Sequence, residues 1–208
     1  PHNIECTILD GSLVYTKKEI LDILKKYKPM FVGQSIQLIS YKNALEIAEF
    51  VHSYGGINIF GGHHATQMID VIIENKGHFV DYIIQGDGEE AWLKIINEEE
   101  KANIPNLVYL NDGMIIHNGI TQTDLSKVPT LDYNRIDLVP YQNKLSMSNF
   151  SNNHYTNYLR IYSHKGCSNR LNSNGCVFCG RADSGVRFKN AEKYWNDILH
   201  SVNEKKAD

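Results

Sequence analysis

Three cysteines near the end of the chain are the residues whose type and spacing most clearly indicate chemistry. Cys167, Cys176 and Cys179 follow the spacing C-x8-C-x2-C. Thiolates are the usual ligands of iron–sulfur clusters, and clustered cysteines in an intracellular protein indicate a metal rather than disulfides. Three cysteines on one loop would leave one iron of a 4Fe-4S cluster open, so that this iron could bind a substrate or a cosubstrate.

Zinc is the alternative metal for these cysteines. His164 precedes Cys167 by three positions, and it would complete a Cys3His set of the kind found in structural zinc sites. The spacing alone does not separate the two metals. The surroundings favour the cluster, because the loop follows a predicted strand over 158–163 and precedes a predicted helix over 191–202. An aromatic residue, Phe178, also stands directly before the last cysteine.

The cysteine loop resembles that of the radical S-adenosylmethionine (SAM) superfamily, whose usual pattern is C-x3-C-x2-C with an aromatic residue before the last cysteine. The first gap here is longer, and we interpret the difference as a local insertion. In that superfamily the cluster binds the amino and carboxylate groups of SAM, injects an electron and yields a 5′-deoxyadenosyl radical. The resemblance implies that Phe178 and Arg181 contact SAM, with a surface arginine as the alternative for Arg181. It also implies an electron donor such as flavodoxin or ferredoxin.

Two glycine-bearing segments form a second group of candidate binding residues. The segment GGHHAT (61–66) follows a predicted strand over 57–60, and GDGEE (86–90) follows a predicted strand over 80–85. Glycine lets a backbone approach a bulky ligand closely, and open parallel sheets bind ligands beyond the carboxyl ends of their strands. We therefore expect both segments at one ligand-binding edge.

These two segments resemble the cobalamin-binding domain that precedes many radical SAM barrels. Those domains often carry GG-x-H-A-T after one strand and G-E-G-E after the next, and Asp87 here stands where that family usually has Glu. The segment LSKVPT (125–130) also resembles the L-x-x-x-P connector into the barrel. The resemblance implies that the following residues lie against cobalamin: Ser35, Gly61, Gly62, His63, His64, Thr66, Gly86, Asp87, Gly88 and Glu89.

Simpler interpretations of these segments stay open. Gly61 and Gly62 can be only a tight strand-to-helix turn with Thr66 as an N-cap, and Asp87 and Glu89 can be solvated acids at the start of a helix. The chain also has no D-x-H-x-x-G motif, which supplies a lower histidine ligand in methionine-synthase-like domains. We therefore expect no protein histidine to replace the base of cobalamin.

Short apolar runs alternate with helical patterns over the first ~120 residues. This alternation predicts an α/β fold with a doubly wound, Rossmann-like parallel sheet and a hairpin at its edge. Thr16 and Glu19 have the spacing of a capping box at the start of the first helix. The predicted strands are 4–10, 30–36, 57–60, 80–85 and 104–110, with a hairpin into 114–117, and the predicted helices are 16–27, 41–54, 67–75 and 90–97.

The chain divides into three predicted parts. A cobalamin-binding-like domain (1–119) is followed by a linker (120–157) that contains Pro129 and Pro140, and then by the start of a radical SAM barrel (158–208). In the helix over 191–202 we expect Trp195, Ile198 and Leu199 to face inward. The resembling family has a further strand and helix before this region and most of a barrel after it. We therefore expect a truncated fragment that is inactive by itself.

The composition is that of an ordinary globular protein, with 208 residues, 42% hydrophobic, 22% charged and a net charge of -3. No basic block supports nucleic-acid binding. The chain contains no run of about 20 apolar residues and no signal-peptide pattern at its start, so no membrane span and a cytoplasmic location are expected. Cys6 lies alone in a predicted strand, where a buried structural thiol is expected.

The sequence therefore predicts a cobalamin-dependent radical SAM enzyme with a 4Fe-4S cluster, SAM and cobalamin as cofactors. The resemblance favours a methyltransferase that acts on a small-molecule or peptide substrate, and the sequence does not identify that substrate. One alternative is a radical SAM enzyme of another reaction type with a degenerate cobalamin domain. The other is a zinc-stabilised α/β binding module.

Overall fold

The computed structural model describes residues 4–76, 78–141, 159, 161–170, 176, 179 and 185–205. The chain forms two compact units, which we describe separately. The sheet unit comprises Leu21–Asp124 and Gly166–Val186, and the helix unit comprises Pro1–Ile20, Leu125–Lys165 and Arg187–Asp208.

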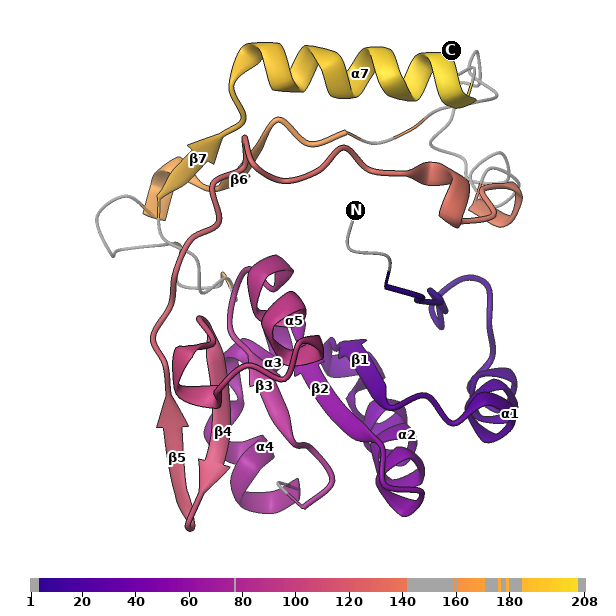
Figure 1. Cartoon of the computed structure of the whole chain (residues 1–208), viewed down its shortest axis with the longest axis vertical. Helices are drawn as coiled ribbons and strands as arrows, with labels where there is room; N and C mark the ends of the chain where they lie inside the picture. The colour runs from indigo at the N-terminus through magenta and orange to yellow at the C-terminus, as the bar shows by residue number, and fades with distance from the viewer. Residues whose placement is uncertain are drawn as a thin grey trace. The chain divides into compact units, whose positions relative to one another are not determined.

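The sheet unit contains a five-stranded mixed sheet with the strand order β1-β2-β3-β4-β5 (Figure 1). Three parallel strands are followed by an antiparallel hairpin at one edge. Asp112 and Gly113 turn that hairpin, both with positive φ (48° and 79°), as the tight turns that match strand twist require. The α/β, Rossmann-like fold with an edge hairpin is therefore confirmed. The strands are β1 (Phe31–Ser35), β2 (Ile57–Gly61), β3 (Tyr82–Ile84), β4 (Leu107–Asn111) and β5 (Met114–His117).

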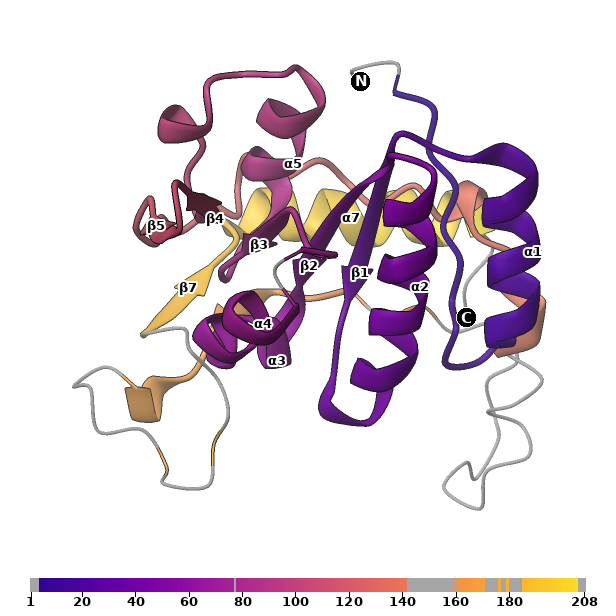
Figure 2. The ribbon, with the colours of Figure 1, turned by 90° about the horizontal axis from the view of Figure 1, so that it is seen from below.

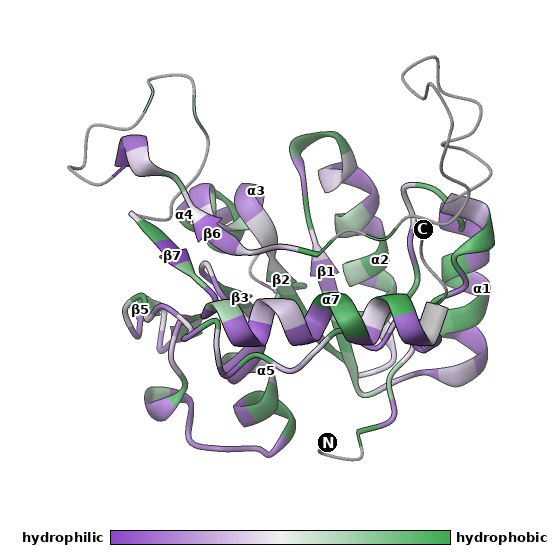
Figure 3. Ribbon diagram, turned by 90° about the horizontal axis from the view of Figure 1, so that it is seen from above, coloured by the Kyte–Doolittle hydropathy of each residue, from purple (hydrophilic) through white to green (hydrophobic). Residues whose placement is uncertain are grey.

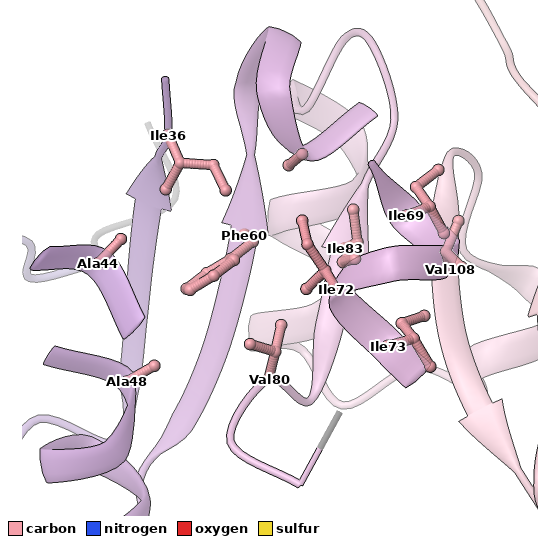
Figure 4. Close-up of a cluster of buried hydrophobic side chains, with 11 residues drawn as sticks. Ile36, Ala44, Ala48, Phe60, Ile69, Ile72, Ile73, Val80, Ile83 and Val108 are labelled. Carbon is pink, nitrogen blue, oxygen red and sulfur yellow. The ribbon is translucent and has the colours of Figure 1, made fainter. Parts of the chain in front are cut away.

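Helices cover both faces of this sheet (Figure 2). On one face, Phe60 of β2 lies among residues from α2 (Tyr41–Ser53) and α4 (Ile69–Lys76), and it is fully buried (Figure 4). On the other face, Ile59 and Ile84 pack with residues of α5 (Glu89–Ile96). Burying a side chain as large as Phe60 contributes about 2–3 kcal/mol, so the alternating apolar residues of β2 hold both layers against the sheet.

The helix α1 (Lys17–Tyr27) begins with the predicted capping box. The Glu19 carboxylate accepts hydrogen bonds from the Thr16 N–H (2.8 Å) and the Thr16 hydroxyl (2.7 Å), and the Glu19 N–H donates to Thr16 Oγ1 (3.3 Å). These bonds satisfy backbone donors that have no partner inside the helix. They also lower the pKa of Glu19.

Two predictions about the first residues are wrong. Residues 4–10 have no regular structure, and Asp10 instead accepts hydrogen bonds from the N–H and hydroxyl of Ser12 in a turn (2.8 and 2.6 Å). Ile8 is 55% exposed, and Cys6 is an exposed free thiol rather than a buried one. An alternating apolar pattern stabilises a strand only where a neighbouring strand and a core are present to receive it.

The predicted helix over 67–75 also differs from the structure. The chain turns into a helix directly after β2, forming α3 (Gly62–Gln67), and α4 follows after an interruption at Met68. The Met68 N–H donates to the carbonyl of His64 (3.0 Å) at the C-cap of α3. The positive φ of Gly62 allows the sharp entry that starts α3 early.

The cysteine region is a hairpin. The strands β6 (His164–Gly166) and β7 (Val186–Phe188) form a two-stranded sheet. Lys189 N–H donates to Ser163 O and Cys167 N–H donates to Gly185 O, both at 2.8 Å. The partner number falls as the residue number rises, so the two strands are antiparallel. The predicted strand over 158–163 is therefore shifted toward the cysteines, since none of its described residues is in a strand.

The helix α7 (Ala191–Lys205) follows β7, so the predicted order of strand, loop and helix is present with one short strand added. With 15 residues it is the longest helix that the structure describes. A bilayer crossing needs about 20 apolar residues, and among the described residues no helix has the required length and hydropathy.

The buried face of α7 is the reverse of the prediction. Trp195 and Leu199 are 59% and 44% exposed, whereas Asp197 and Ser201 are each only 3% exposed. Ile198 is partly buried. Figure 3 shows that apolar and polar residues alternate along this helix. The inward prediction is wrong for Trp195 and Leu199, because Asp197 on the other face is paired with two lysines and Ser201 donates to the Asp197 carbonyl.

Candidate cofactor-binding edge and cysteine loop

The carboxyl ends of β1 and β2 lie side by side. Ser35 pairs with Gly61 in the parallel register, and the Ile36 N–H donates to the Gly61 carbonyl at 2.9 Å. At Gly62, with φ +88°, a Cβ would lie 3.0 Å from Ser35 Oγ and 3.1 Å from the Ile36 carbonyl oxygen. Gly62 therefore lets the start of α3 pack directly against the end of β1, and its own α-carbon faces protein atoms.

Gly61 differs from Gly62 in its backbone conformation and in its packing. Its φ is −148°, which is ordinary extended backbone, and the nearest atom to an added Cβ would be the Ile84 carbonyl oxygen at 3.8 Å. Gly61, at the end of the central parallel strand, is thus loosely packed, since an added Cβ would make only one ordinary van der Waals contact among the described residues. A ligand could approach the backbone at this point.

Thr66 connects the loop after β2 to the loop after β3. The Gly86 N–H donates to Thr66 Oγ1 at 3.3 Å, and Gly86 adopts φ +68°. Thr66 lies within α3, whose N-cap is Gly61, so the interpretation of Thr66 as an N-cap is wrong. The two glycine-bearing segments therefore meet at one edge, as the sequence predicted.

Asp87 holds its loop in place. Its carboxylate accepts a hydrogen bond from the Thr123 N–H at 3.0 Å, and its carbonyl accepts one from Asn106 Nδ2 at 2.6 Å. Asn106 is 3% exposed, has φ +64°, and bonds both ways with the backbone of Thr121. Asp87 is therefore not a simple solvated acid. Sequence reasoning missed Asn106, because the predicted strand over 104–110 included it, whereas β4 begins at Leu107.

Of the remaining predicted residues of this edge, His64 and Gly88 are partly buried, and His63 and Glu89 are exposed. The His64 ring meets the Tyr41 ring edge-on, with centroids 5.0 Å apart, and burial raises the pKa of Tyr41. His63 is exposed on α3. Gly88 is the N-cap of α5, and the exposed Glu89 is the first residue of that helix, where an acid is favoured by the helix dipole.

The cysteine loop supplies three thiols, and none of them forms a disulfide. Cys167 directly follows β6 and is partly buried, as is Cys179, whereas Cys176 is exposed. The Cys179 N–H donates to the Cys176 carbonyl at 2.8 Å. Asn169 Nδ2 lies 3.8 Å from Cys176 Sγ. The C-x2-C pair is thus held in a turn, a local arrangement that suits two ligands of one metal.

The structure does not favour an iron–sulfur cluster over zinc, or zinc over the cluster. Among the described residues, no three histidine, cysteine or acidic side chains are grouped closely enough to hold an ion. His164, the candidate fourth zinc ligand, is exposed, with Nδ1 3.0 Å from Ser163 Oγ and its ring 5.6 Å from that of Phe188. Phe178 and Arg181, the predicted SAM contacts, lie outside the described residues.

Gly166 is a residue of this loop that sequence reasoning missed. Its φ is +98°, and a Cβ there would lie 2.1 Å from the Gly185 carbonyl oxygen, which no side chain can tolerate. The close approach of the two strands immediately before Cys167 therefore requires glycine.

Solved structures share the fold of this chain, although no protein-family model and no curated protein matches its sequence. The radical SAM methyltransferase TsrM from Kitasatospora setae, with tryptophan substrate and the SAM analogue aza-SAM bound, superposes with a TM-score of 0.67 at 15% identity. TsrM with cobalamin and a [4Fe-4S] cluster bound gives 0.64 at 14%. The apo form of OxsB, a cobalamin-dependent SAM radical enzyme, gives 0.63 at 19%.

The chain has the fold of cobalamin-dependent radical SAM enzymes. The similarity covers 97% of it in both TsrM structures and 96% in OxsB. The family resemblance inferred from short motifs is thus confirmed in the fold. The chain spans 40–41% of the TsrM chains and 27% of the OxsB chain.

The residues present fit the cofactors of such radical SAM enzymes in two respects. At the sheet edge, Gly61 carries no side chain and is loosely packed, with a single contact at 3.8 Å for an added Cβ. In the hairpin loop, three free thiols supply the donor type that iron–sulfur clusters use.

Proposed function

We propose that this chain is part of a cobalamin-dependent radical SAM enzyme, and that the reaction is a methyl transfer. The loosely packed backbone at Gly61, where an added Cβ would meet only the Ile84 carbonyl oxygen at 3.8 Å, is the observation that carries the proposal. It lies at the carboxyl edge of three parallel strands, where open α/β sheets bind their ligands. The shared fold supports the same conclusion.

In this proposal the sheet edge binds cobalamin. Gly61 allows its backbone to approach the cofactor, and Ser35, at the adjoining strand end, offers a hydroxyl to the nucleotide tail. The Thr66–Gly86 and Asp87–Thr123 hydrogen bonds fix the loop that lies beside them. These contacts position and orient a large ligand, and none of them requires a histidine bond to cobalt.

The cysteine loop is the proposed cluster site. Cys167, Cys176 and Cys179 would hold a 4Fe-4S cluster through their thiolates, and Phe178 and Arg181 would contact SAM. When bound, the cluster would supply the electron that cleaves SAM, and cobalamin would carry the methyl group. The substrate is a small molecule or a peptide, and flavodoxin or ferredoxin would serve as the electron donor.

Hydroxocobalamin retention tests the first part of the proposal. The purified chain is incubated with hydroxocobalamin, passed through a desalting column and scanned for corrin absorbance. We expect close to one equivalent per chain, and a marked loss in Gly61→Val, whose branched side chain would stand where the ligand approaches the backbone. A natively folded chain that retains no corrin would contradict cobalamin binding, and would favour a degenerate cobalamin domain.

Anaerobic reconstitution with iron and sulfide tests the second part. We expect a brown chain with iron and sulfide in the ratio of a 4Fe-4S cluster. Metal analysis that finds one zinc and no iron would instead select the zinc-stabilised binding module. Cys176→Ala should abolish the binding of either metal. This variant therefore tests Cys176 as a metal ligand, and the metal analysis identifies the metal.

A further inference from the structure

A buried group of ion pairs and hydrogen bonds links α7 to Lys189 and Thr130. Lys189 Nζ donates to Asp197 Oδ2 at 2.6 Å, and the two side chains are only 2% and 4% exposed. The other carboxylate oxygen accepts from Thr130 Oγ1 at 2.6 Å and from Lys193 Nζ. Lys193 Nζ also lies 2.7 Å from Thr130 Oγ1. We call these four residues the α7 lock.

The lock occupies a place that an amphipathic helix normally fills with apolar residues. Burying charges is costly unless each is paired and hydrogen-bonded. Here the Asp197 carboxylate has three hydrogen-bond partners. The apolar Trp195 of the same helix is exposed, although burying it would have cost no charge desolvation. A hydrophobic contact can slide, whereas a buried ion pair with these directional bonds fixes one register of α7 against its neighbours.

The lock also holds the base of the cysteine hairpin. The Lys189 N–H donates to the Ser163 carbonyl at 2.8 Å, and Lys189 Nζ lies 4.0 Å from the centre of the Tyr162 ring. One residue therefore joins the chain just after β7 to the chain just before β6. Cys167 follows β6 immediately, so the loop that carries the thiols begins one residue after this strand.

We propose that the α7 lock positions the cysteine hairpin for metal binding, with Lys189 and Asp197 as positioning residues. This inference rests on the proposed function, because it assumes that Cys167, Cys176 and Cys179 bind one cluster. Three thiols on a long loop meet at a cost in chain entropy. Fixed loop ends reduce the freedom that the thiols must lose when they gather around a metal.

The experiment compares lock variants with a matched change on the same helix. Asp197→Asn keeps the size of the side chain and removes the charge, and Lys189→Met removes the ammonium. Glu192→Gln removes a carboxylate charge from an exposed position of α7. Each variant of the 208-residue chain is reconstituted anaerobically, and its iron and sulfide content, its reduced-cluster EPR spectrum and the rate of iron loss to a chelator are measured.

We expect Asp197→Asn and Lys189→Met to lose iron to the chelator ~10-fold faster than wild type or more, since residues supporting metal ligands typically affect affinity by that much. Glu192→Gln should behave as wild type. Lys189→Arg, which keeps the charge and the bond to Asp197, should restore part of the loss. All rates are compared below the unfolding transition of each variant, so a lower melting temperature alone does not mimic the effect.

Thr130→Val keeps the inference testable if the charge variants do not fold. It removes only the hydroxyl that bonds Asp197 and Lys193, and we expect an intermediate rate of iron loss. Folded lock variants that hold iron as tightly as wild type would overturn the positioning role and leave the proposed function intact. A wild-type chain that takes up no cluster would overturn both.

Discussion

Replacing Gly62 by alanine tests the closest packing at the sheet edge. A residue with a Cβ at φ +88° is strained by about 1–2 kcal/mol. The new Cβ would also lie 3.0–3.2 Å from Ser35 Oγ and from the backbone oxygen and nitrogen of Ile36. Two of these atoms belong to the backbone and cannot rotate away, and overpacking of this kind costs about 1–3 kcal/mol. We therefore expect Gly62→Ala to lose about 2–5 kcal/mol of unfolding free energy.

Gly61→Ala is the matched control, because it makes the same chemical change one residue earlier. The backbone at Gly61 is extended, and the nearest atom to a new Cβ is 3.8 Å away. The expected loss is below about 1 kcal/mol, mainly from the poorer N-cap. Urea denaturation followed by far-ultraviolet circular dichroism compares both variants with wild type, and hydroxocobalamin retention is measured on the same samples.

The two variants should give different results in the urea and corrin-retention assays. Gly61→Ala should keep its fold and bind corrin more weakly, whereas Gly62→Ala should unfold at clearly lower urea. A Gly62→Ala chain with the urea midpoint of wild type would refute the packing argument. Unchanged corrin retention in Gly61→Ala would refute the claim that a ligand approaches this backbone.

Three further predictions concern the local structures that the fold depends on. Thr16→Ala should cost about 1 kcal/mol in urea denaturation through loss of the capping box; an unchanged midpoint would show that the cap is not needed. Burial raises the pKa of Asp197, but hydrogen bonds from Lys189, Lys193 and Thr130 outweigh it and lower the pKa to about 2. Because this value lies below the unfolded one, the carboxylate contributes roughly 2 kcal/mol above pH ~4 that is lost as the pH falls toward 2. Asp197→Asn should show a flatter acid-stability profile, and an identical slope would contradict this. Gly166→Ala should prevent β6–β7 pairing and abolish cluster uptake, and normal iron content would contradict this.

The parts of the fold that the sequence predicted have local causes. The Thr16–Glu19 capping box depends on residues three positions apart, and its bonds form as expected. The hairpin at Asp112 and Gly113 depends on two adjacent residues that accept positive φ. The strand-end glycines follow the same logic, because the edge of a parallel sheet determines where their loops meet.

The parts that the sequence did not predict depend on distant partners. Residues 4–10 have an apolar alternation, but strand formation needs a neighbouring strand, which no local pattern reveals. The buried face of α7 depends on a hydrogen bond between Asp197 and Thr130, which are 67 positions apart. Hydrophobic periodicity counts apolar side chains, so it assigns the wrong face wherever polar groups are buried with their partners.

The same limit applies inside the candidate site, where the motif alone made Gly61 and Gly62 equivalent. The structure separates them, because an added Cβ at Gly62 would press against the end of β1, whereas one at Gly61 would make a single ordinary contact. Gly62 is thus explained by the packing of α3 against the sheet, without any ligand. The packing of the sheet offers no comparable reason for Gly61, since a Cβ there would contact nothing closer than 3.8 Å. Of the two glycines, Gly61 is therefore the one whose presence favours a bound cofactor.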